Sequence, residues 1–477
     1  MISIVKRHPR ITSAVVAGVA FAAAIVVAVV VANPSGAARH AAGFQKRTRA
    51  HFDHTPVIPA AFDSPQAVTR ACLGCHPDAA EVMKSSHWTW LGEEVEVPGH
   101  AGKTRIGKKN LINNFCIINR GNERSCTRCH AGYGWFDEKF DFAKAENVDC
   151  LVCHERTHAY VKGQGGMPAK GTDLVAAARS VGTPGRENCL TCHAFGGGGQ
   201  AVKHGDLDSS LVHPSPEVDV HIGRHDFQCI DCHRTERHQI RGRAFSVSVE
   251  DANGAACTDC HTKPEHRDAR LDTHLKSVAC QTCHVPTFAR TIPTKATWDW
   301  SQAGDAKRAE DPHSYLKIKG EFAYEQDAVP EYRWFNLTAG RYLLGDKIDP
   351  EGVTAINPPQ GGIGDPKAKI WPFKIHRGKQ PYDAGFAYLL PPTTGGTNGY
   401  WTNFDWDNAF RLGAKANGLE YSGRYGFAKT EMYWPLTHMV APKESALGCT
   451  DCHGERSRFD WTALGYAGDP MKTGGRP

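Results

Sequence analysis

Residues 113–154 read NNFCIINRGNERSCTRCHAGYGWFDEKFDFAKAENVDCLVCH and contain two copies of the pattern Cys-x-x-Cys-His, together with a separate cysteine, Cys116. In this pattern the two thiols form thioether bonds with the vinyl groups of a c-type haem, and the histidine becomes the proximal ligand of the iron. The spacing is therefore set by the cofactor. The rest of the chain is organised around this stretch.

The pattern occurs eight times along the chain. In chain order the motifs are Cys72, Cys75 and His76; Cys126, Cys129 and His130; Cys150, Cys153 and His154; Cys189, Cys192 and His193; Cys229, Cys232 and His233; Cys257, Cys260 and His261; Cys280, Cys283 and His284; and Cys449, Cys452 and His453. With 17 cysteines and 25 histidines in 477 residues, random placement would give about 0.03 such pentapeptides. A single copy could also be a zinc site or a disulfide pair, but eight copies leave almost no room for either. We predict eight covalently bound haems c.

The cysteine count leaves Cys116 as the one thiol outside the motifs, because eight sites use sixteen of the 17 cysteines. A disulfide framework within the chain is therefore excluded. An iron that only carries electrons needs a second axial ligand, and 25 minus 8 leaves seventeen further histidines. This supply is sufficient for bis-histidine coordination at most sites.

The composition predicts short helices and much loop. Hydrophobic residues make up 40% of the chain, and it contains 48 glycines and 28 prolines. The expected fold is mainly α with much irregular loop, a multihaem cytochrome c fold whose core is built from eight covalently attached haems. The formal net charge of +5 omits the haem propionates, about two per haem. We therefore predict no nucleic-acid partner.

Residues 1–34 are predicted to be an export signal or a membrane anchor. Lys6, Arg7 and Arg10 precede Ile11–Ala32, a run of twenty-two uncharged and mostly apolar residues. A run of this length can span a bilayer, which favours a retained anchor, while small residues near its end keep a cleaved signal as the alternative. The basic residues place the amino terminus in the cytoplasm. The bulk of the chain is then expected in the periplasm, the side on which c-type haem is attached.

The spacing of the motifs divides the remaining chain into four parts. We expect a linker at 35–62, a haem-binding core with seven motifs at 63–290, a wrapping segment without motifs at 291–448, and the eighth motif with a tail at 449–477. The motif-free part is rich in aromatic residues, proline and glycine, and no helical or strand period is sustained in it. It is expected to wrap the haems and to line a substrate entrance or a subunit interface.

Seven further histidines are the candidates for distal iron ligands. They are His87, His204, His221, His238, His274, His376 and His438. His87 is expected on a helix after the first motif, because Pro77 and acidic residues stand near its start. His313 is an additional candidate. The alternative for each is an ordinary surface or core histidine.

Several long stretches resemble the octahaem cytochromes c of the tetrathionate reductase type, which are related more distantly to hydroxylamine oxidoreductase and pentahaem nitrite reductase. The matching stretches are 72–80, 87–90, 113–116, 126–135, 148–154, 196–199, 202–210, 227–229, 238–240 and 462–471. They run across most of the exported region.

The resemblance implies one catalytic haem with a lysine as its distal ligand and seven bis-histidine haems. The catalytic haem would be the one at Cys126, Cys129 and His130, and its lysine would be Lys203. An amine binds iron only when it is deprotonated, so burial of Lys203 would help. Cys116 matches the cysteine that the family has beside this iron. Gln200 departs from the family pattern, which is acidic there.

The first hypothesis is a reductase that splits tetrathionate into two thiosulfates. Electrons would come from a redox partner protein or a quinol-linked donor, and Lys295 is a candidate positive group near the dianionic substrate. The Cys116 thiolate would attack a sulfur–sulfur bond and hold the sulfenyl fragment while two electrons arrive.

Two other functions stay open. One is reduction of nitrite or hydroxylamine, or oxidation of hydroxylamine, at the same haem. For the oxidation, the related family uses a tyrosine crosslinked to the porphyrin, and no tyrosine can be assigned that role from the sequence. The other is a pure electron carrier in which every iron is six-coordinate. A calcium ion near the active site is a further cofactor candidate that no motif supports.

Overall fold

The computed structural model describes residues 51–476 apart from 116, 243–244, 250–253, 263–265 and 267. The chain separates into two compact units, Met1–Arg47 with Ala256–Arg267, and Thr48–Ala255 with Asp268–Pro477. We call the second the main unit. The first contains the sixth motif, which begins with the 3-10 helix η8, Cys257–Asp259.

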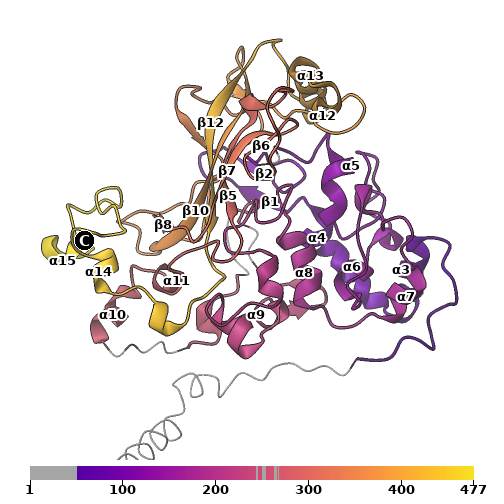
Figure 1. Ribbon diagram of the computed structural model, residues 1–477, viewed down its shortest axis with the longest axis horizontal. Helices are drawn as coiled ribbons and strands as arrows, with labels where there is room; N and C mark the ends of the chain where they lie inside the picture. The colour runs from indigo at the N-terminus through magenta and orange to yellow at the C-terminus, as the bar shows by residue number, and fades with distance from the viewer. Residues whose placement is uncertain are drawn as a thin grey trace, which may run out of the picture. The chain divides into compact units, whose positions relative to one another are not determined.

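Short helices carry the motifs of the main unit (Figure 1). Its α-helices before the sheet are α3 Pro65–Cys75, α4 Ser86–Thr89, α5 Glu123–Cys126, α6 Leu151–His154, α7 Leu174–Arg179, α8 Arg186–His193, α9 Cys229–Cys232, α10 Ala269–His274 and α11 Cys280–His284. Those within or after the sheet are α12 Tyr400–Asn403, α13 Trp406–Asn417, α14 Cys449–Cys452 and α15 Pro470–Thr473. In a helical turn, side chains three positions apart share one face, so the two thiols of a motif can reach the same porphyrin edge.

The other helical turns of the main unit are short. The 3-10 helices are η2 Pro77–Lys84, η3 Thr127–Cys129, η4 Ala145–Asn147, η5 Gln164–Gly166, η6 Ser209–Val212, η9 Trp300–Gln302 and η10 Lys443–Ser445, and η7 Val220–Arg224 is a π-helix. Within the described ranges, no helix combines the length and apolar character needed to cross a bilayer. The predicted anchor, residues 11–32, lies outside these ranges.

The end of the predicted linker is packed against the first motif helix. Ser64 caps α3 by accepting the backbone N–H of Ala67 at 3.2 Å. The helix buries Val68 in a cluster with Leu151 of the third motif, and Ile58 and Phe62 pack against that cluster. Ile58 and Phe62, near the end of the predicted linker, therefore pack in the main unit.

The motif-free segment contains an eight-stranded sheet, which the sequence did not predict. Its strands are β5 Thr294–Asp299, β6 Tyr315–Leu316, β7 Gly320–Glu325, β8 Glu331–Phe335, β9 Val353–Ala355, β10 Lys369–Asp383, β11 Tyr388–Leu389 and β12 Tyr425–Pro435. The strand order is β6-β7-β5-β10-β12-β9, with β8 and β11 also paired to β10. Two small hairpins, β1 Glu94–Glu96 with β2 Lys103–Arg105 and β3 Thr235–Glu236 with β4 Gln239–Ile240, lie outside it. Helix remains the more common element and much of the chain is irregular, as predicted, but the expectation of a mainly α fold omitted this sheet.

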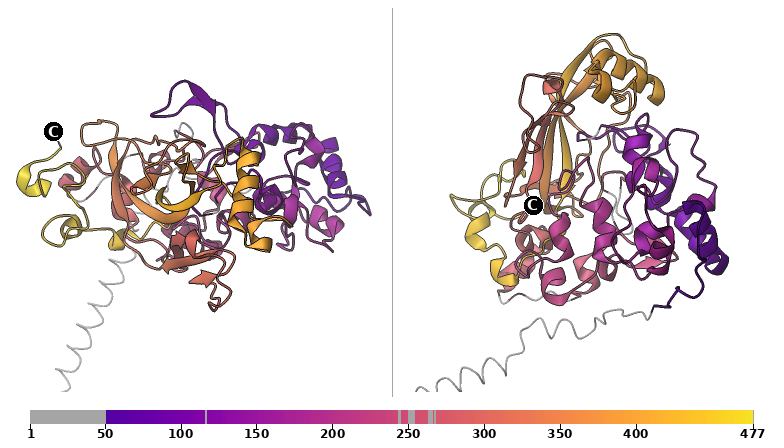
Figure 2. Two further views of the ribbon diagram at one scale, coloured as in Figure 1. Left: turned by 90° about the horizontal axis from the view of Figure 1, so that it is seen from above. Right: turned by 45° about the vertical axis from the view of Figure 1, so that its right-hand side comes forward.

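Strand β10 is the central strand, and its residues explain why no period was visible. It pairs antiparallel with β12 from Phe373 opposite Pro435 to Asp383 opposite Tyr425. Most of its side chains are buried on both faces, so apolar and polar residues do not alternate. Pro372 and Pro381 also interrupt the strand pattern. Figure 2 shows β10 and β12 running together, with α12 and α13 at one end of these strands.

A large hydrophobic cluster joins this sheet to the motif-bearing part of the main unit. Trp298 and Phe322 come from β5 and β7, and Trp434 comes from β12. Phe115 and Val202, from loops between the motifs, pack in the same cluster. The loops that flank Cys116 and Lys203 are thus held against one surface of the sheet.

Candidate haem-binding and catalytic sites

Five motif histidines each face a second histidine ring. The pairs, with their ring-centroid distances, are His76 with His54 at 6.1 Å, His193 with His87 at 6.1 Å, His154 with His238 at 6.3 Å, His233 with His438 at 6.2 Å, and His453 with His274 at 6.2 Å. Imidazole lies about 2 Å from a first-row metal, so two ligating nitrogens on one iron are about 4 Å apart. The ring centres lie about 1 Å beyond each nitrogen. These five sites therefore fit a haem iron between two imidazoles.

Hydrogen bonds to the Nδ1 atoms set the orientation of these rings. His54, His154, His233 and His274 contact backbone carbonyl oxygens of Phe52, Gly182, Arg241 and Arg270 at 2.9, 2.9, 2.8 and 2.9 Å. His438 and His453 contact the carboxylates of Asp206 and Asp469 at 3.2 and 2.7 Å. When Nδ1 donates its proton to such an acceptor, Nε2 keeps the lone pair that binds a metal.

The pairs include four of the seven candidate distal ligands, His87, His238, His274 and His438. The ring beside His76 is that of His54, which was not among the candidates and stands in the predicted linker. No fixed spacing connects a distal ligand to its motif. The only sequence signal for His54 was the need for more histidines than the motifs contain.

The other three candidates have different neighbours. The ring centroid of His204 lies 4.9 Å from that of Trp434, and His221 lies 5.9 Å from Phe227. His376 is fully buried on β10, and its Nδ1 lies 3.0 Å from Asn114 Oδ1. His313, the additional candidate, is exposed and lies 5.6 Å from the ring of Tyr324.

Thiols from different motifs lie next to one another. Cys72 interacts with Cys150, Cys129 with Cys192, and Cys189 with Cys229. The first motif is therefore beside the third, and the second, fourth and fifth follow one another in space, as a chain of electron carriers requires.

The proximal histidine of the second motif is enclosed by aromatic rings. His130 is 0% exposed, and the ring centroids of Trp135 and Trp88 lie 4.8 and 4.9 Å from its own. Burial lowers the pKa of His130 to about 3, so the ring is neutral, as a metal ligand must be. Its Nε2 lies 2.7 Å from the Trp88 carbonyl oxygen. Its Nδ1 is buried without a hydrogen-bond partner among the described residues. The two nitrogens thus have the reverse of the roles seen at His154 and His233, and the ring must turn before Nε2 can bind iron.

Lys203 interacts electrostatically with Cys129 of the second motif and with His193 of the fourth. Desolvation lowers the pKa of Lys203 to about 7, the charge of Lys108 acts in the same direction, and Cys129 of the motif acts in the opposite one. Its Nζ lies 5.0 Å from the ring centre of Trp434. A large fraction of this lysine is therefore neutral near pH 7, as an amine that binds iron must be.

The glycines at 196–199 allow Lys203 and the loop at 113–117 to approach each other. Gly197 has φ +83, and a Cβ atom there would lie 2.8 Å from Phe115 Cδ2. A Cβ atom on Gly196 would lie 3.2 Å from Cδ of Lys203. Any side chain at Gly197 would thus combine backbone strain with a clash.

Cys116 lies outside the described residues, but its neighbours form a tight turn. Asn113 Oδ1 accepts the backbone N–H groups of Phe115 and Ile117 at 3.2 and 3.0 Å, and the N–H of Asn113 donates to the Ile117 carbonyl at 2.6 Å. Ile117 is buried and has φ +75. The side chain of Phe115 then packs on the sheet cluster that includes Trp434.

The other two candidate catalytic residues, Lys295 and Gln200, make contacts of different kinds. Lys295 is 2% exposed, and its Nζ lies 3.5 and 3.7 Å from the ring centres of Phe322 and Trp298. This geometry is a cation–π interaction. Gln200 Nε2 donates to the Ser209 hydroxyl. Gln200 thus binds a neighbouring turn, and it provides no carboxylate.

His376 is a buried polar group that the sequence did not place in this region. Desolvation lowers the pKa of His376 well below its usual value, and the charges of Lys374 and Lys295 act in the same direction. Asn114 Nδ2 donates to the His376 carbonyl at 2.7 Å, which orients the amide so that Oδ1 faces Nδ1 of the ring. His376 Nε2 has no hydrogen-bond partner among the described residues. The region around Lys203 is therefore rich in basic groups.

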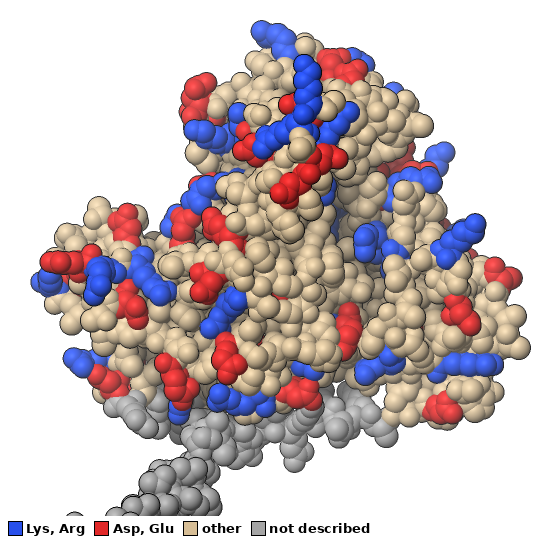
Figure 3. All heavy atoms as spheres, in the orientation of Figure 1, with Lys and Arg blue, Asp and Glu red and all other residues tan. Residues whose placement is uncertain are grey.

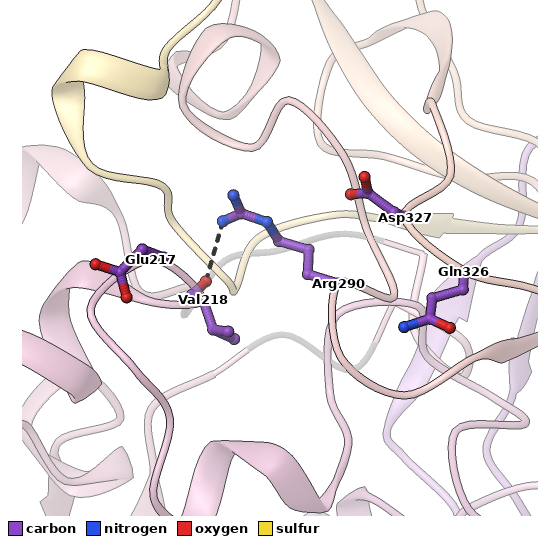
Figure 4. Close-up of a pocket in the computed structure, with 5 residues that line it drawn as sticks. All are labelled: Glu217, Val218, Arg290, Gln326 and Asp327. Atoms are coloured by element: carbon purple, nitrogen blue, oxygen red, sulfur yellow. Dashed lines mark hydrogen bonds between the residues drawn. The ribbon is translucent and has the colours of Figure 1, made fainter.

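Two further features lie outside this region. A cavity of about 570 Å³ is lined by Glu217, Val218, Arg290, Gln326 and Asp327, and Arg290 Nη1 donates to the Val218 carbonyl at 3.2 Å (Figure 4). Acidic and basic side chains are mixed over the face in Figure 3, without a continuous basic area. Among the described residues, no group of three or more His, Cys, Asp or Glu side chains could hold a metal ion. The calcium candidate stays untested.

The chain is similar to known cytochromes. A family model described as bacterial cytochrome c matches residues 295–456. The crystal structure of octahaem cytochrome c from Shewanella oneidensis has 48% sequence identity and a TM-score of 0.83, and the match covers 88% of this chain and 98% of that one. An uncharacterized protein of Archaeoglobus fulgidus is 26% identical over 239 residues, which are 39% of this chain and 80% of the relative.

Proposed function

Because this chain belongs to the octahaem cytochromes c, we propose that it is a reductase that splits tetrathionate into two thiosulfates at the haem of Cys126, Cys129 and His130. Family membership makes it a multihaem c-type cytochrome that transfers electrons. Tetrathionate as the substrate is the part that we propose. The number of haems that we propose, eight, follows from the eight motifs.

The observation that carries the proposal is the position of Lys203. Five motif histidines face a second imidazole, which closes those iron sites. The proximal histidine of the second motif is surrounded by aromatic rings instead, and the amine beside that motif has a pKa of about 7. An amine with this pKa holds its proton less tightly than an ordinary lysine does. Near pH 7 it can therefore bind the iron, or leave it when the substrate binds.

The reaction needs two electrons and a nucleophile. The haem supplies the electrons when it is bound. The Cys116 thiolate attacks an inner sulfur of tetrathionate, one thiosulfate leaves, and the second stays attached to Cys116 through a new sulfur–sulfur bond. Two electrons then cleave that bond, which releases the second thiosulfate and restores the thiolate.

The basic groups of this region support an anionic substrate. Lys295 and Lys374 are buried, and the charges of both act on His376. Desolvation lowers the pKa of Lys374 to about 7, so only part of this lysine is charged near neutral pH. Tetrathionate is a dianion, and it keeps both negative charges until the first sulfur–sulfur bond breaks. Buried positive groups at such a site stabilise developing negative charge more strongly than they would in water.

The test compares tetrathionate, nitrite and hydroxylamine as oxidants of a reduced viologen dye with the fully haem-loaded protein. We expect tetrathionate to be preferred, and we expect Lys203→Met and Cys116→Ala to abolish its turnover while the bis-histidine haem spectrum stays intact. Preference for the nitrogen substrates with no effect of Cys116→Ala would establish nitrogen chemistry. Absence of turnover with all three, and of any cyanide binding, would establish a pure electron carrier.

The setting of the reaction is a further part of the proposal. We place the haem-bearing chain in the periplasm, tethered through residues 11–32 if these are not cleaved, because c-type haem is attached on that side of the membrane. Its electrons would come from a redox partner protein or a quinol-linked donor. Protease protection in intact spheroplasts would measure the side of the membrane, and a fully protected chain would contradict this placement.

A further inference from the structure

A buried lysine on β10 holds the turn that carries Lys203. Lys374 is 1% exposed. Its Nζ donates to the Val202 carbonyl at 2.9 Å, to the Thr294 hydroxyl at 2.6 Å and to the Lys203 carbonyl at 3.3 Å. One buried amino group therefore binds the backbone on both sides of the Cα atom of Lys203.

The beginning of β5 holds the same turn from a second direction. The Thr294 hydroxyl contacts the carbonyl oxygens of Ala201 and His204 at 2.7 and 3.1 Å. The backbone N–H of Lys295 donates to the Ala201 carbonyl at 3.2 Å. Ala201 has φ +53, a conformation that an alanine keeps only when its surroundings fix it. The sheet therefore imposes the shape of residues 201–204.

This turn presents two side chains that can bind iron. Lys203 and His204 are adjacent, and both lie against the same ring. The Nζ atom of Lys203 is 5.0 Å from the Trp434 ring centre, and the His204 ring centroid is 4.9 Å from it. A turn that was free to rotate would let either residue face the second motif. The contacts of the turn must therefore determine whether the Lys203 amine or the His204 imidazole faces it.

We propose that Lys374 is a positioning residue that fixes the turn at 201–204, so that the amine of Lys203 and not the imidazole of His204 faces the second motif. The inference rests on the proposed role of Lys203. Removing the amino group leaves the carbonyls of Val202 and Lys203 without their buried donor, and these carbonyls can regain hydrogen bonds only if the turn moves.

The test uses electron paramagnetic resonance and near-infrared magnetic circular dichroism of the ferric, fully haem-loaded protein. The signal to follow is the one that wild type shows and Lys203→Met lacks. Lys374→Met should lose most of this signal, and Lys374→Arg, which keeps a charged donor, should keep more of it. The matched control is Lys379→Met, the same change on the same strand at a half-buried lysine that lies 3.6 Å from Asp299.

The outcomes separate the inference from the proposed function. If wild type and Lys203→Met have the same spectrum, the role of Lys203 fails, and the proposed function fails with it. If that difference exists but Lys374→Met retains the full signal, Lys374 does not position the turn. If Lys374→Met does not fold, Thr294→Val is the deciding variant, because it removes one hydroxyl and no charge. A reduced signal in Thr294→Val supports the positioning of the turn by Lys374 and Thr294. A wild-type signal overturns it.

Discussion

Asp206 accepts hydrogen bonds from His438 at two places, from its backbone N–H at 2.9 Å and from its ring Nδ1 at 3.2 Å. The same carboxylate oxygen accepts the backbone N–H of Thr437 at 2.7 Å. Desolvation would raise the pKa of Asp206, but its bonds with His438 and Thr437 hold the pKa below the usual value. Asp206 is three residues after Lys203, so one short segment serves the second and the fifth motif.

We predict that Asp206→Asn raises the reduction potential of the haem between His233 and His438. A carboxylate on Nδ1 makes the imidazole more basic and stabilises ferric iron, and an amide does so less. Spectroelectrochemical titration should show one haem shifted to higher potential. Asp469→Asn should shift a different haem, because Asp469 binds the ring of His453. Identical titration curves for wild type and both variants would rule out this tuning.

We predict that His54→Met changes the axial ligation of the first haem. His54 faces His76, and a methionine in its place would raise the potential of that haem. The control is His51→Met, since the His51 ring lies 5.1 Å from that of His54 and is equally near the chain terminus. One low-spin signal should change in the first variant and none in the second. If both variants keep all signals, another residue is the ligand of the first haem.

We predict that Gly197→Ala costs more stability than Gly134→Ala. Both glycines have φ +83, so both substitutions introduce the same backbone strain, about 1–2 kcal/mol. A Cβ atom at Gly134 meets nothing within 4 Å, whereas one at Gly197 lies 2.8 Å from Phe115. The extra cost should be about 1–3 kcal/mol. Thermal unfolding of the two variants measures the difference. Equal midpoints would show that the loop around Gly197 moves away from Phe115 without a loss of stability.

We predict that the stabilising effect of Asp383 is lost in acid. Burial acts to raise the pKa of Asp383, but hydrogen bonds from Ser422, Phe386 and Gly385 lower it overall. A carboxyl with a lowered folded-state pKa stabilises the fold above its unfolded pKa, about 3.9, and this contribution disappears as pH falls through the folded value.

Asp383→Asn should therefore reduce the free energy of unfolding by about 1–3 kcal/mol near pH 7. The difference from wild type should become smaller below pH about 4. Denaturant unfolding at several pH values measures it. A difference that does not depend on pH would mean that the charge of Asp383 has no part in holding the end of β10.

The covalent chemistry of the cofactor made part of the site predictable. A porphyrin dictates where its two thiols and its proximal histidine stand in the sequence, so the motifs could be read directly. The prediction of Lys203 rests only on the resemblance, because nothing in the residues near it distinguishes a ligand from a surface lysine. His54, whose ring lies 6.1 Å from that of His76, had no local signal, since the fold and not the spacing brings these two rings together.

The sheet was missed for a different reason. Strand β10 is covered on both faces and contains Pro372 and Pro381, so neither alternation nor a continuous apolar run marks it. The partner strand β12 lies more than forty residues later in the chain. Its pairing with β10 therefore depends on long-range contacts that no local pattern records.

The contacts between thiols of different motifs also bear on how the protein matures. Cys72 is next to Cys150, Cys129 next to Cys192, and Cys189 next to Cys229. In an oxidising compartment, neighbouring free thiols readily form disulfides. A polypeptide that collapsed to this arrangement before receiving its porphyrins would crosslink the wrong cysteines and block several attachment sites at once. If the chain matures in the periplasm, as proposed, attachment of haem before compaction would avoid these crosslinks.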